Sequence, residues 1–285
     1  MKEHAAYISD SIASHTIILP GMLDRKDYRS MTTLADNIMR TVGGTVSVID
    51  MFQLDGVKRV TDSTRVVYDC DWTQADYFRK IKDDLDQHTH TKNSLVGFSY
   101  GAYTALLYGA LDKVLGYKQV DNIAAIMPVN FFSWGEAYNP GMDLRWVGEQ
   151  YRSNGVIDLS TTYMGLRHAD LNHPSDDEMT VRVPRSVITN HTRPFEGFLQ
   201  DNPISVTVTG LTDKGIMPEV GARTLVVAGE NDILNDAEVT YNIYTRLPTD
   251  RRHFRRLKGV QHDYRISAGQ TTAVNNVVAS WLAAN

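Results

Sequence analysis

The feature that most constrains this chain is a regular alternation of short apolar runs with longer segments of helical periodicity. The apolar runs are four to eight residues long, and a helical pattern follows most of them. We expect strands at 16–19, 45–52, 93–98, 122–129, 224–228 and 253–257, and helices at 28–42, 73–88, 100–115, 237–247 and 271–284. Parallel strands need long crossovers, usually helices. The alternation therefore predicts an α/β fold with a mostly parallel central sheet flanked by helices.

This rhythm is lost in one long segment. Residues 131–221 lack the alternation and are too numerous for a plain connection in a compact domain. We expect a core domain, 1–130 and 222–285, and an inserted, largely helical cap at 131–221. Such a cap would cover the carboxyl edge of the sheet, where ligands bind in open α/β folds. The stretch 53–71 is irregular or holds a short extra element.

Aromatic side chains of the expected cap are candidates for lining an apolar substrate pocket. Packing of the cap onto the core is the simpler use for most of them. The candidates are Phe131, Trp134, Trp146 and Tyr163.

Composition and charge exclude several functional classes. The 285 residues carry a formal net charge of −5, whereas a nucleic-acid binder shows a basic excess. Cys70 is the only cysteine, so an internal disulfide and a thiolate-rich zinc site are excluded. No stretch approaches the roughly 20 apolar residues of a membrane helix. We expect a cytoplasmic protein, monomeric or homodimeric, with a small-molecule substrate and no nucleic-acid or membrane partner.

One short motif carries a specific chemistry. The chain reads Gly97-Phe98-Ser99-Tyr100-Gly101, with an apolar run before it and a helical pattern after it. A serine at a sharp strand-to-helix turn exposes its hydroxyl, and small residues two before and two after let neighbouring backbone pass close by. The N-terminus of the helix would then face a developing oxyanion. The alternative is a glycine-flanked turn without chemistry.

Taken together, four segments resemble the α/β-hydrolase superfamily. They are IILPGM at 17–22, GFSYG at 97–101, GEND at 229–232 and QHD at 261–263. The resemblance covers about 16–130 and 222–284, and it implies a serine, acid, histidine order along the chain.

The resemblance also implies the partners of Ser99. Asp232 would be the acid, because it follows the expected strand that ends near Gly229. Glu230 and Asp236 compete for that role, and Asp236 also fits a helix cap. His262 would be the base, since it lies between the last expected strand and the last helix.

An oxyanion hole in this family uses two backbone N–H groups. The resemblance assigns them to Tyr100, directly after the serine, and to Met22, in the loop after the first strand. Family members usually carry His-Gly in that loop, whereas this chain has Pro20-Gly21. A plain Pro-Gly turn is the alternative.

The other histidines are expected at the surface or in the cap. They are His15, His88, His90, His168, His173, His191 and His253. The pairs His88/His90 and His168/His173 have spacings that metal ligands use, but neither has a third ligand nearby in sequence. We therefore expect neither a metal nor a cofactor.

The function indicated is a serine hydrolase that cleaves a small or medium-sized, partly apolar ester, thioester or lactone through an acyl-enzyme on Ser99. Serine rather than aspartate at the elbow disfavours the dehalogenases and epoxide hydrolases of the superfamily. Three alternatives stay open: a C–C bond hydrolase, an aminopeptidase, or a ligand-binding protein without catalysis.

Overall fold

The structure is a computed structural model of the chain. It describes residues 14–21, 26, 29–49, 60–62, 65–69, 74–89, 91–128, 157–158, 179–182, 217–232, 235 and 237–285.

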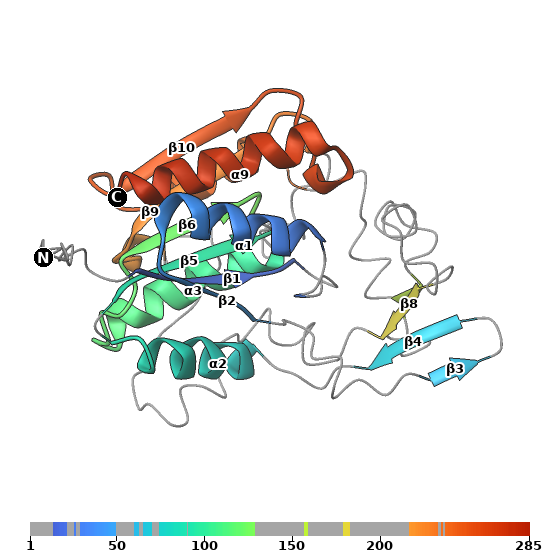
Figure 1. The fold of residues 1–285 in the computed structure, drawn as a ribbon, viewed down its shortest axis with the longest axis horizontal. Helices are drawn as coiled ribbons and strands as arrows, with labels where there is room; N and C mark the ends of the chain where they lie inside the picture. The colour runs from blue at the N-terminus through green and yellow to red at the C-terminus, as the bar shows by residue number, and fades with distance from the viewer. Residues whose placement is uncertain are drawn as a thin grey trace, which may run out of the picture.

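A six-stranded sheet forms the centre of the molecule (Figure 1). Its strands are β1 (Ser14–Leu19), β2 (Thr45–Val48), β5 (Lys92–Phe98), β6 (Asn122–Ile126), β9 (Arg223–Gly229) and β10 (Arg252–Leu257). They lie in the order β10-β9-β6-β5-β1-β2, and every neighbouring pair is parallel. This sheet confirms the α/β fold class expected from the alternation.

Helices cover both faces of the sheet. On one face, α1 (Arg29–Val42) and α9 (Ala268–Ala283) share an apolar cluster with inward side chains such as Val96 of β5. On the other face, α2 (Gln74–Asp86), α3 (Tyr100–Val114) and α8 (Ala237–Arg246) share a second cluster with Leu95 and Ile123. Because side chains alternate along each strand, neighbouring residues of β5 serve opposite clusters.

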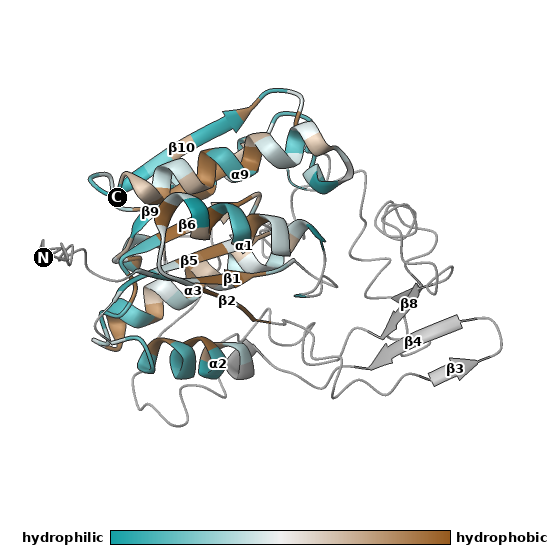
Figure 2. Cartoon of the chain, in the orientation of Figure 1, coloured by the Kyte–Doolittle hydropathy of each residue, from teal (hydrophilic) through white to brown (hydrophobic). Residues whose placement is uncertain are grey.

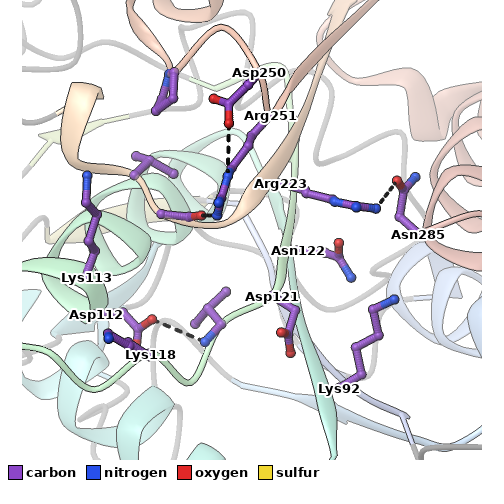
Figure 3. Close-up of a pocket in the computed structure, with 14 residues that line it drawn as sticks. Lys92, Asp112, Lys113, Lys118, Asp121, Asn122, Arg223, Asp250, Arg251 and Asn285 are labelled. Atoms are coloured by element: carbon purple, nitrogen blue, oxygen red, sulfur yellow. Dashed lines mark hydrogen bonds and ion pairs between the residues drawn. The ribbon is translucent and has the colours of Figure 1, made fainter.

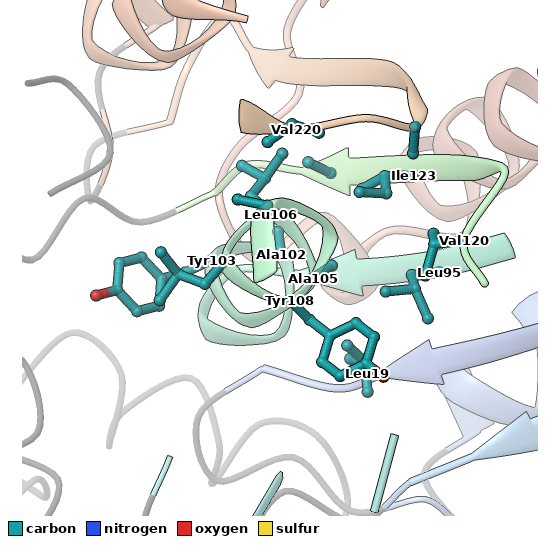
Figure 4. Close-up of a cluster of buried hydrophobic side chains, with 14 of the residues drawn as sticks. Leu19, Leu95, Ala102, Tyr103, Ala105, Leu106, Tyr108, Val120, Ile123 and Val220 are labelled. Atoms are coloured by element: carbon teal, nitrogen blue, oxygen red, sulfur yellow. The ribbon is translucent and has the colours of Figure 1, made fainter. Parts of the chain in front are cut away.

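Hydropathy explains the depth of each element. The inner strands are brown in Figure 2, whereas β10 at the sheet edge is largely teal. Helix α1 buries Met31, Leu34, Ala35 and Ile38, the spacing of a helix with one apolar stripe. Helix α3 is different, because its residues from Tyr100 to Asp112 are all buried. Figure 4 shows its side chains beside the sheet face that carries Leu95 of β5 and Ile123 of β6.

The expected elements of the core are all present, with shifted ends. The second strand stops at Val48 and the fourth at Ile126, earlier than their apolar runs suggest. Met127 follows with a φ of 48°, a left-handed conformation that ends the strand. The last helix begins at Ala268, three residues before its expected start, because Ser267 directly before it is extended.

A second sheet involves the two segments that lacked the rhythm. It has the order β3-β4-β8-β7, and its strands are β3 (Val60–Asp62), β4 (Arg65–Asp69), β7 (Ile157–Asp158) and β8 (Met179–Arg182). Strand β4 pairs with β8, so the short extra element near 53–71 is joined to the insertion.

The expected cap falls mostly outside the described residues. Of the elements described within 131–221, β7 and β8 are strands, and η2 (Met217–Glu219) is a short 3₁₀ helix. The division into a core and a cap stays a prediction. None of the described helices is long and apolar enough to cross a lipid bilayer.

Candidate active site

Ser99 occupies a strained turn between β5 and α3. Its φ of 53° and ψ of −113° are unusual for a residue with a side chain. Two backbone hydrogen bonds hold it: its N–H donates to the carbonyl of Ile126 at 2.9 Å, and its carbonyl accepts from the N–H of Tyr103 at 3.1 Å. The elbow expected from sequence is therefore present, with Ser99 at its tip.

The flanking glycines are required by close backbone approaches. A Cβ on Gly97 would overlap the carbonyl of Gly101. A Cβ on Gly101 would overlap the carbonyl oxygens of Leu19 and Pro20, where β1 ends. The start of α3 thus lies directly against the end of β1, at Leu19 and Pro20.

His262 lies within hydrogen-bond distance of both Ser99 and Asp232. The Nε2 atom is 2.9 Å from the Ser99 Oγ, and the Nδ1 atom is 2.8 Å from the Asp232 Oδ2. A carboxylate only accepts hydrogen bonds, so Nδ1 carries the proton of a neutral imidazole and Nε2 can accept from the serine hydroxyl. All three residues are at least nine-tenths buried.

Two loops at neighbouring strand ends bring the acid and the base together. Asp232 follows β9, and His262 follows β10, its parallel neighbour. The N–H of Glu230 donates to the carbonyl of Leu257 at 3.0 Å, and the N–H of Asn231 donates to that of Val260 at 2.9 Å. These bonds join the two loops and set the separation of Asp232 and His262.

The competing acids have other positions. The Glu230 carboxylate accepts the backbone N–H of Gly259 at 3.0 Å, and its side chain is exposed. Asp236 lies outside the described residues. Among the described acids, Asp232 is the one bonded to His262.

Asn235 is a supporting residue that the sequence did not single out. Its backbone N–H donates to the Asp232 Oδ1 at 2.8 Å, so each carboxylate oxygen has a donor. Its side-chain amide donates to the carbonyl of Pro128 at 2.5 Å and to the Thr240 Oγ1 at 2.7 Å. The sequence signal that could have identified Asn235 is its position two residues before the start of α8, a region where Asn is common.

The expected oxyanion donors are only partly described. Tyr100 is the first residue of α3 and directly follows Ser99, as the elbow requires. Burial and the neighbouring Tyr100 raise the pKa of the Tyr103 phenol of α3 well above its usual range, so this phenol stays neutral. Met22 lies outside the described residues, as do Phe131, Trp134, Trp146 and Tyr163.

One histidine expectation is wrong. His15 is 1% exposed, because it lies on β1, an inner strand covered on both faces. Its Nδ1 is 2.7 Å from the Thr45 Oγ1, and its Nε2 is 2.5 Å from the Asp84 Oδ1. Its ring stacks on that of His88 at a centroid distance of 3.6 Å. His15 therefore ties β1 to β2 and α2.

His15, Asp84 and His88 form the one metal-ligand grouping found in the described part of the chain. The two rings are parallel within 4° and 3.6 Å apart. An imidazole nitrogen binds a metal in its ring plane at about 2 Å, so stacked rings cannot share one ion. Burial raises the pKa of Asp84, but hydrogen bonds from His15 and Ser47 and the charges of both histidines outweigh it and hold that pKa low.

A cleft of about 700 Å³ lies at the amino ends of the strands (Figure 3). Ser99 lies at the other end of the strands, after the carboxyl end of β5. The first residues of three strands, Lys92, Asn122 and Arg223, line it. Its charges are mixed, and ion pairs such as Lys113–Glu219 and Arg251–Asp250 engage part of them. This cleft is separate from the Ser99–His262–Asp232 site, and its mixed charge selects no ligand class.

A comparison of the sequence with protein families now decides the assignment. The profile described as alpha/beta hydrolase fold matches residues 17–262. The chain belongs to the α/β-hydrolase fold family. The matched range reaches from β1 through the elbow to His262, so it contains all three candidate residues of this α/β hydrolase.

Solved structures support the same fold at low sequence identity. Monoacylglycerol lipase of Paleococcus ferrophilus is 13% identical, with a TM-score of 0.62 over 96% of each chain. Est1E of Butyrivibrio proteoclasticus with ferulic acid bound is 13% identical, with a TM-score of 0.56 over 95% of this chain and 88% of that one. Mouse alpha/beta hydrolase domain-containing protein 10 is 12% identical, with a TM-score of 0.60 over 94% of this chain and 89% of that one. No curated protein matches this α/β hydrolase in sequence.

Proposed function

We propose that this α/β hydrolase is a serine hydrolase that cleaves an ester-like bond. The observation that carries the proposal is the continuous hydrogen-bonded chain from the Ser99 Oγ through His262 to Asp232. A serine hydroxyl is a poor nucleophile without a base beside it, and here the base and its orienting carboxylate are both within 2.9 Å.

The proposed reaction has two steps. The Ser99 Oγ attacks the substrate carbonyl while the His262 Nε2 accepts its proton, and Asp232 stabilises the imidazolium. The leaving alkoxide departs with that proton, and an acyl group stays on Ser99. Water, which loses a proton to His262, then attacks the acyl carbonyl and releases the acid and the free serine. The N–H groups of Tyr100 and Met22 are the proposed donors to each oxyanion.

We further propose a small or medium-sized, partly apolar substrate. Two of the similar structures are a monoacylglycerol lipase and an Est1E with ferulic acid bound, and both names point to partly apolar acyl compounds. Four features stay predictions of the sequence. They are the choice among ester, thioester and lactone, the cap, the cytoplasmic location and the oligomeric state.

A fluorophosphonate probe tests the proposal, because it reacts with activated serines. We expect labelling at Ser99, located by peptide mass spectrometry. The labelling should vanish in Ser99→Ala and fall by at least about 100-fold in His262→Ala, since the base is then missing. Ser267→Ala, which changes a serine before α9 away from the triad, is the control and should label like wild type. A folded wild-type protein that neither labels nor hydrolyses p-nitrophenyl esters would overturn the proposal.

A further inference from the structure

The ring of Phe98 is surrounded by the residues that follow His262. Phe98 ends β5 and directly precedes Ser99. Its ring centroid lies 5.3 Å from that of His262 and 5.3 Å from that of Tyr264, which meets it edge-on. The guanidinium carbon of Arg265 lies over the same ring, 4.6 Å from its centroid. One aromatic ring therefore contacts the proposed base and two residues just after it.

A buried ion pair holds Arg265 in that place. Its Nε donates to the Asp263 Oδ1 at 2.7 Å, and the two side chains are 5% and 9% exposed. A buried ion pair is a weak source of stability, because apolar side chains of similar volume often serve as well. Two buried charges immediately after His262 therefore point to a role other than stability.

The backbone of this loop is anchored from the other side by α9. The N–H of Gln261 donates to the Gln270 Oε1 at 3.1 Å, and the Thr271 Oγ1 donates to the carbonyl of Tyr264 at 3.3 Å. With the loop backbone fixed, the imidazole of His262 can still rotate about its side-chain bonds. The Phe98 ring is the neighbour that limits this rotation on one side.

We propose that Arg265, held by Asp263, is a positioning residue that fixes the Phe98 ring and through it the imidazole of His262 against Ser99. The cation stacks on the face of the ring, an attractive contact that gains strength when it is desolvated. Since Phe98 and Ser99 are adjacent in the chain, a shift of this ring would disturb the base and the nucleophile together. This inference rests on the proposed function.

The first test compares turnover of p-nitrophenyl butyrate. Phe98→Leu and Arg265→Met should each lower kcat by about 10- to 100-fold with little change in KM, because small misplacements of reacting groups cost that much. Arg265→Lys keeps the charge but loses the planar stack, so it should fall between Arg265→Met and wild type. Arg256→Gln removes an exposed cation of β10 and is the matched control, expected at wild-type activity.

The double variant Phe98→Leu/Arg265→Met separates a shared path from two independent defects. If Arg265 acts through the ring, the double variant should lose no more activity than Phe98→Leu alone. Losses that multiply would overturn the proposal, as would full activity in Arg265→Met.

The pH profile of kcat/KM gives a readout that a merely structural role would not move. Among the described residues, the charged groups beside the imidazole are Asp232, which it contacts, and Asp263 and Arg265 of its own loop, whereas Glu230 is exposed and binds the N–H of Gly259. Asp263→Asn removes a negative charge near the imidazole, which disfavours the imidazolium, so the acid limb should shift to lower pH. Arg265→Met removes a positive charge near the imidazole, which favours the imidazolium, so the limb should shift to higher pH. Shifts in the same direction would contradict this positioning role.

A measurement without turnover distinguishes failure of the inference from failure of the proposed function. The proton between the His262 Nδ1 and Asp232 should give a far-downfield proton NMR resonance. Arg265→Met and Phe98→Leu should shift or broaden it, and Arg256→Gln should leave it unchanged. If the wild type is inactive and unlabelled but its resonance still changes in these variants, the proposed hydrolase function is wrong and the positioning contact is supported. An unchanged resonance in both variants would sink the positioning contact alone.

Discussion

At the scale of single residues, the site requires two glycines, which have no Cβ, as well as the side chains that react. Ser99 adopts its strained backbone because the surrounding hydrogen bonds to Ile126 and Tyr103 hold it. Gly97 and Gly101 have no Cβ, so the strand end and the helix start can meet without overlap. Backbone strain of this kind is often found at functional residues, so it supports the proposed role of Ser99 as the nucleophile.

Gly101→Ala tests the close approach of α3 to β1. The added Cβ would overlap two backbone carbonyl oxygens, which cannot move away as a flexible side chain can. We expect the free energy of unfolding to fall by about 2–4 kcal/mol and fluorophosphonate labelling to be lost. Urea unfolding followed by circular dichroism measures the first effect.

Gly269→Ala is the matched control for that variant. Its nearest neighbour to an added Cβ is the Ser267 Oγ at 3.8 Å, and it lies within α9. Alanine favours a helix over glycine by up to about 1 kcal/mol, so stability should stay equal or rise. Equal stability losses in the two variants would contradict the overlap argument.

At the scale of elements, the packing of α2 against the sheet includes a polar connection. Asp84 of α2 bonds to His15 of β1, whose other ring nitrogen contacts Thr45 of β2. The ring of His88, just after α2, stacks on that of His15. Three elements therefore meet at one buried imidazole that local sequence patterns placed at the surface.

Asp84→Asn tests this connection through pH. The pKa of Asp84 is lowered in the folded protein, so ionised Asp84 stabilises the fold above its unfolded pKa of about 3.9. That stability is lost as the pH falls through the lower folded pKa. We expect Asp84→Asn to reduce the free energy of unfolding by about 2 kcal/mol near pH 6 and by much less near pH 3, measured by urea unfolding.

A pH-independent difference between wild type and Asp84→Asn would show that the carboxylate charge plays no part in the connection. Asp36→Asn is the control, because Asp36 is exposed on α1. Its stability should match wild type at both pH values.

At the scale of the whole molecule, the site depends on four neighbouring strands of the central sheet. Ser99 follows β5, Asp232 follows β9 and His262 follows β10, and β6 lies between β5 and β9. Strand β6 contributes as well, because the carbonyl of Ile126 at its end accepts the N–H of Ser99, and the carbonyl of Pro128 just after it accepts the side-chain amide of Asn235. The carboxyl ends of parallel strands meet at one edge, which is where such folds place ligands.

This assembly predicts that the site and the sheet unfold together. In a urea series, fluorophosphonate labelling of Ser99 should fall with the same midpoint as the far-ultraviolet circular dichroism signal. Coincident transitions are expected because β5, β6, β9 and β10, four of the six strands, together position the three side chains. Labelling that disappears well before the sheet unfolds would show that the site is a separate, weaker unit.

Much of this protein could be predicted from its sequence, because the deciding signals are local. The alternation of strands and helices, the glycines around Ser99, and the order of Ser99, Asp232 and His262 along the chain all follow from spacing and from the family resemblance. The ends of β2 and β6 differed because an apolar run continues past the last extended residue, and Met127 after β6 has a left-handed φ of 48°.

Tertiary structure alone decided which side chains meet. Strand β1 lies between β2 and β5, so His15 is buried although its neighbours in sequence suggest exposure. The support that Asn235 gives to Asp232 and the contact of Arg265 with Phe98 join residues that are 3 and 167 positions apart. Local sequence patterns determine which segments form helices and strands. The pairing of distant segments is selected by packing of the whole core, and no single segment contains that information.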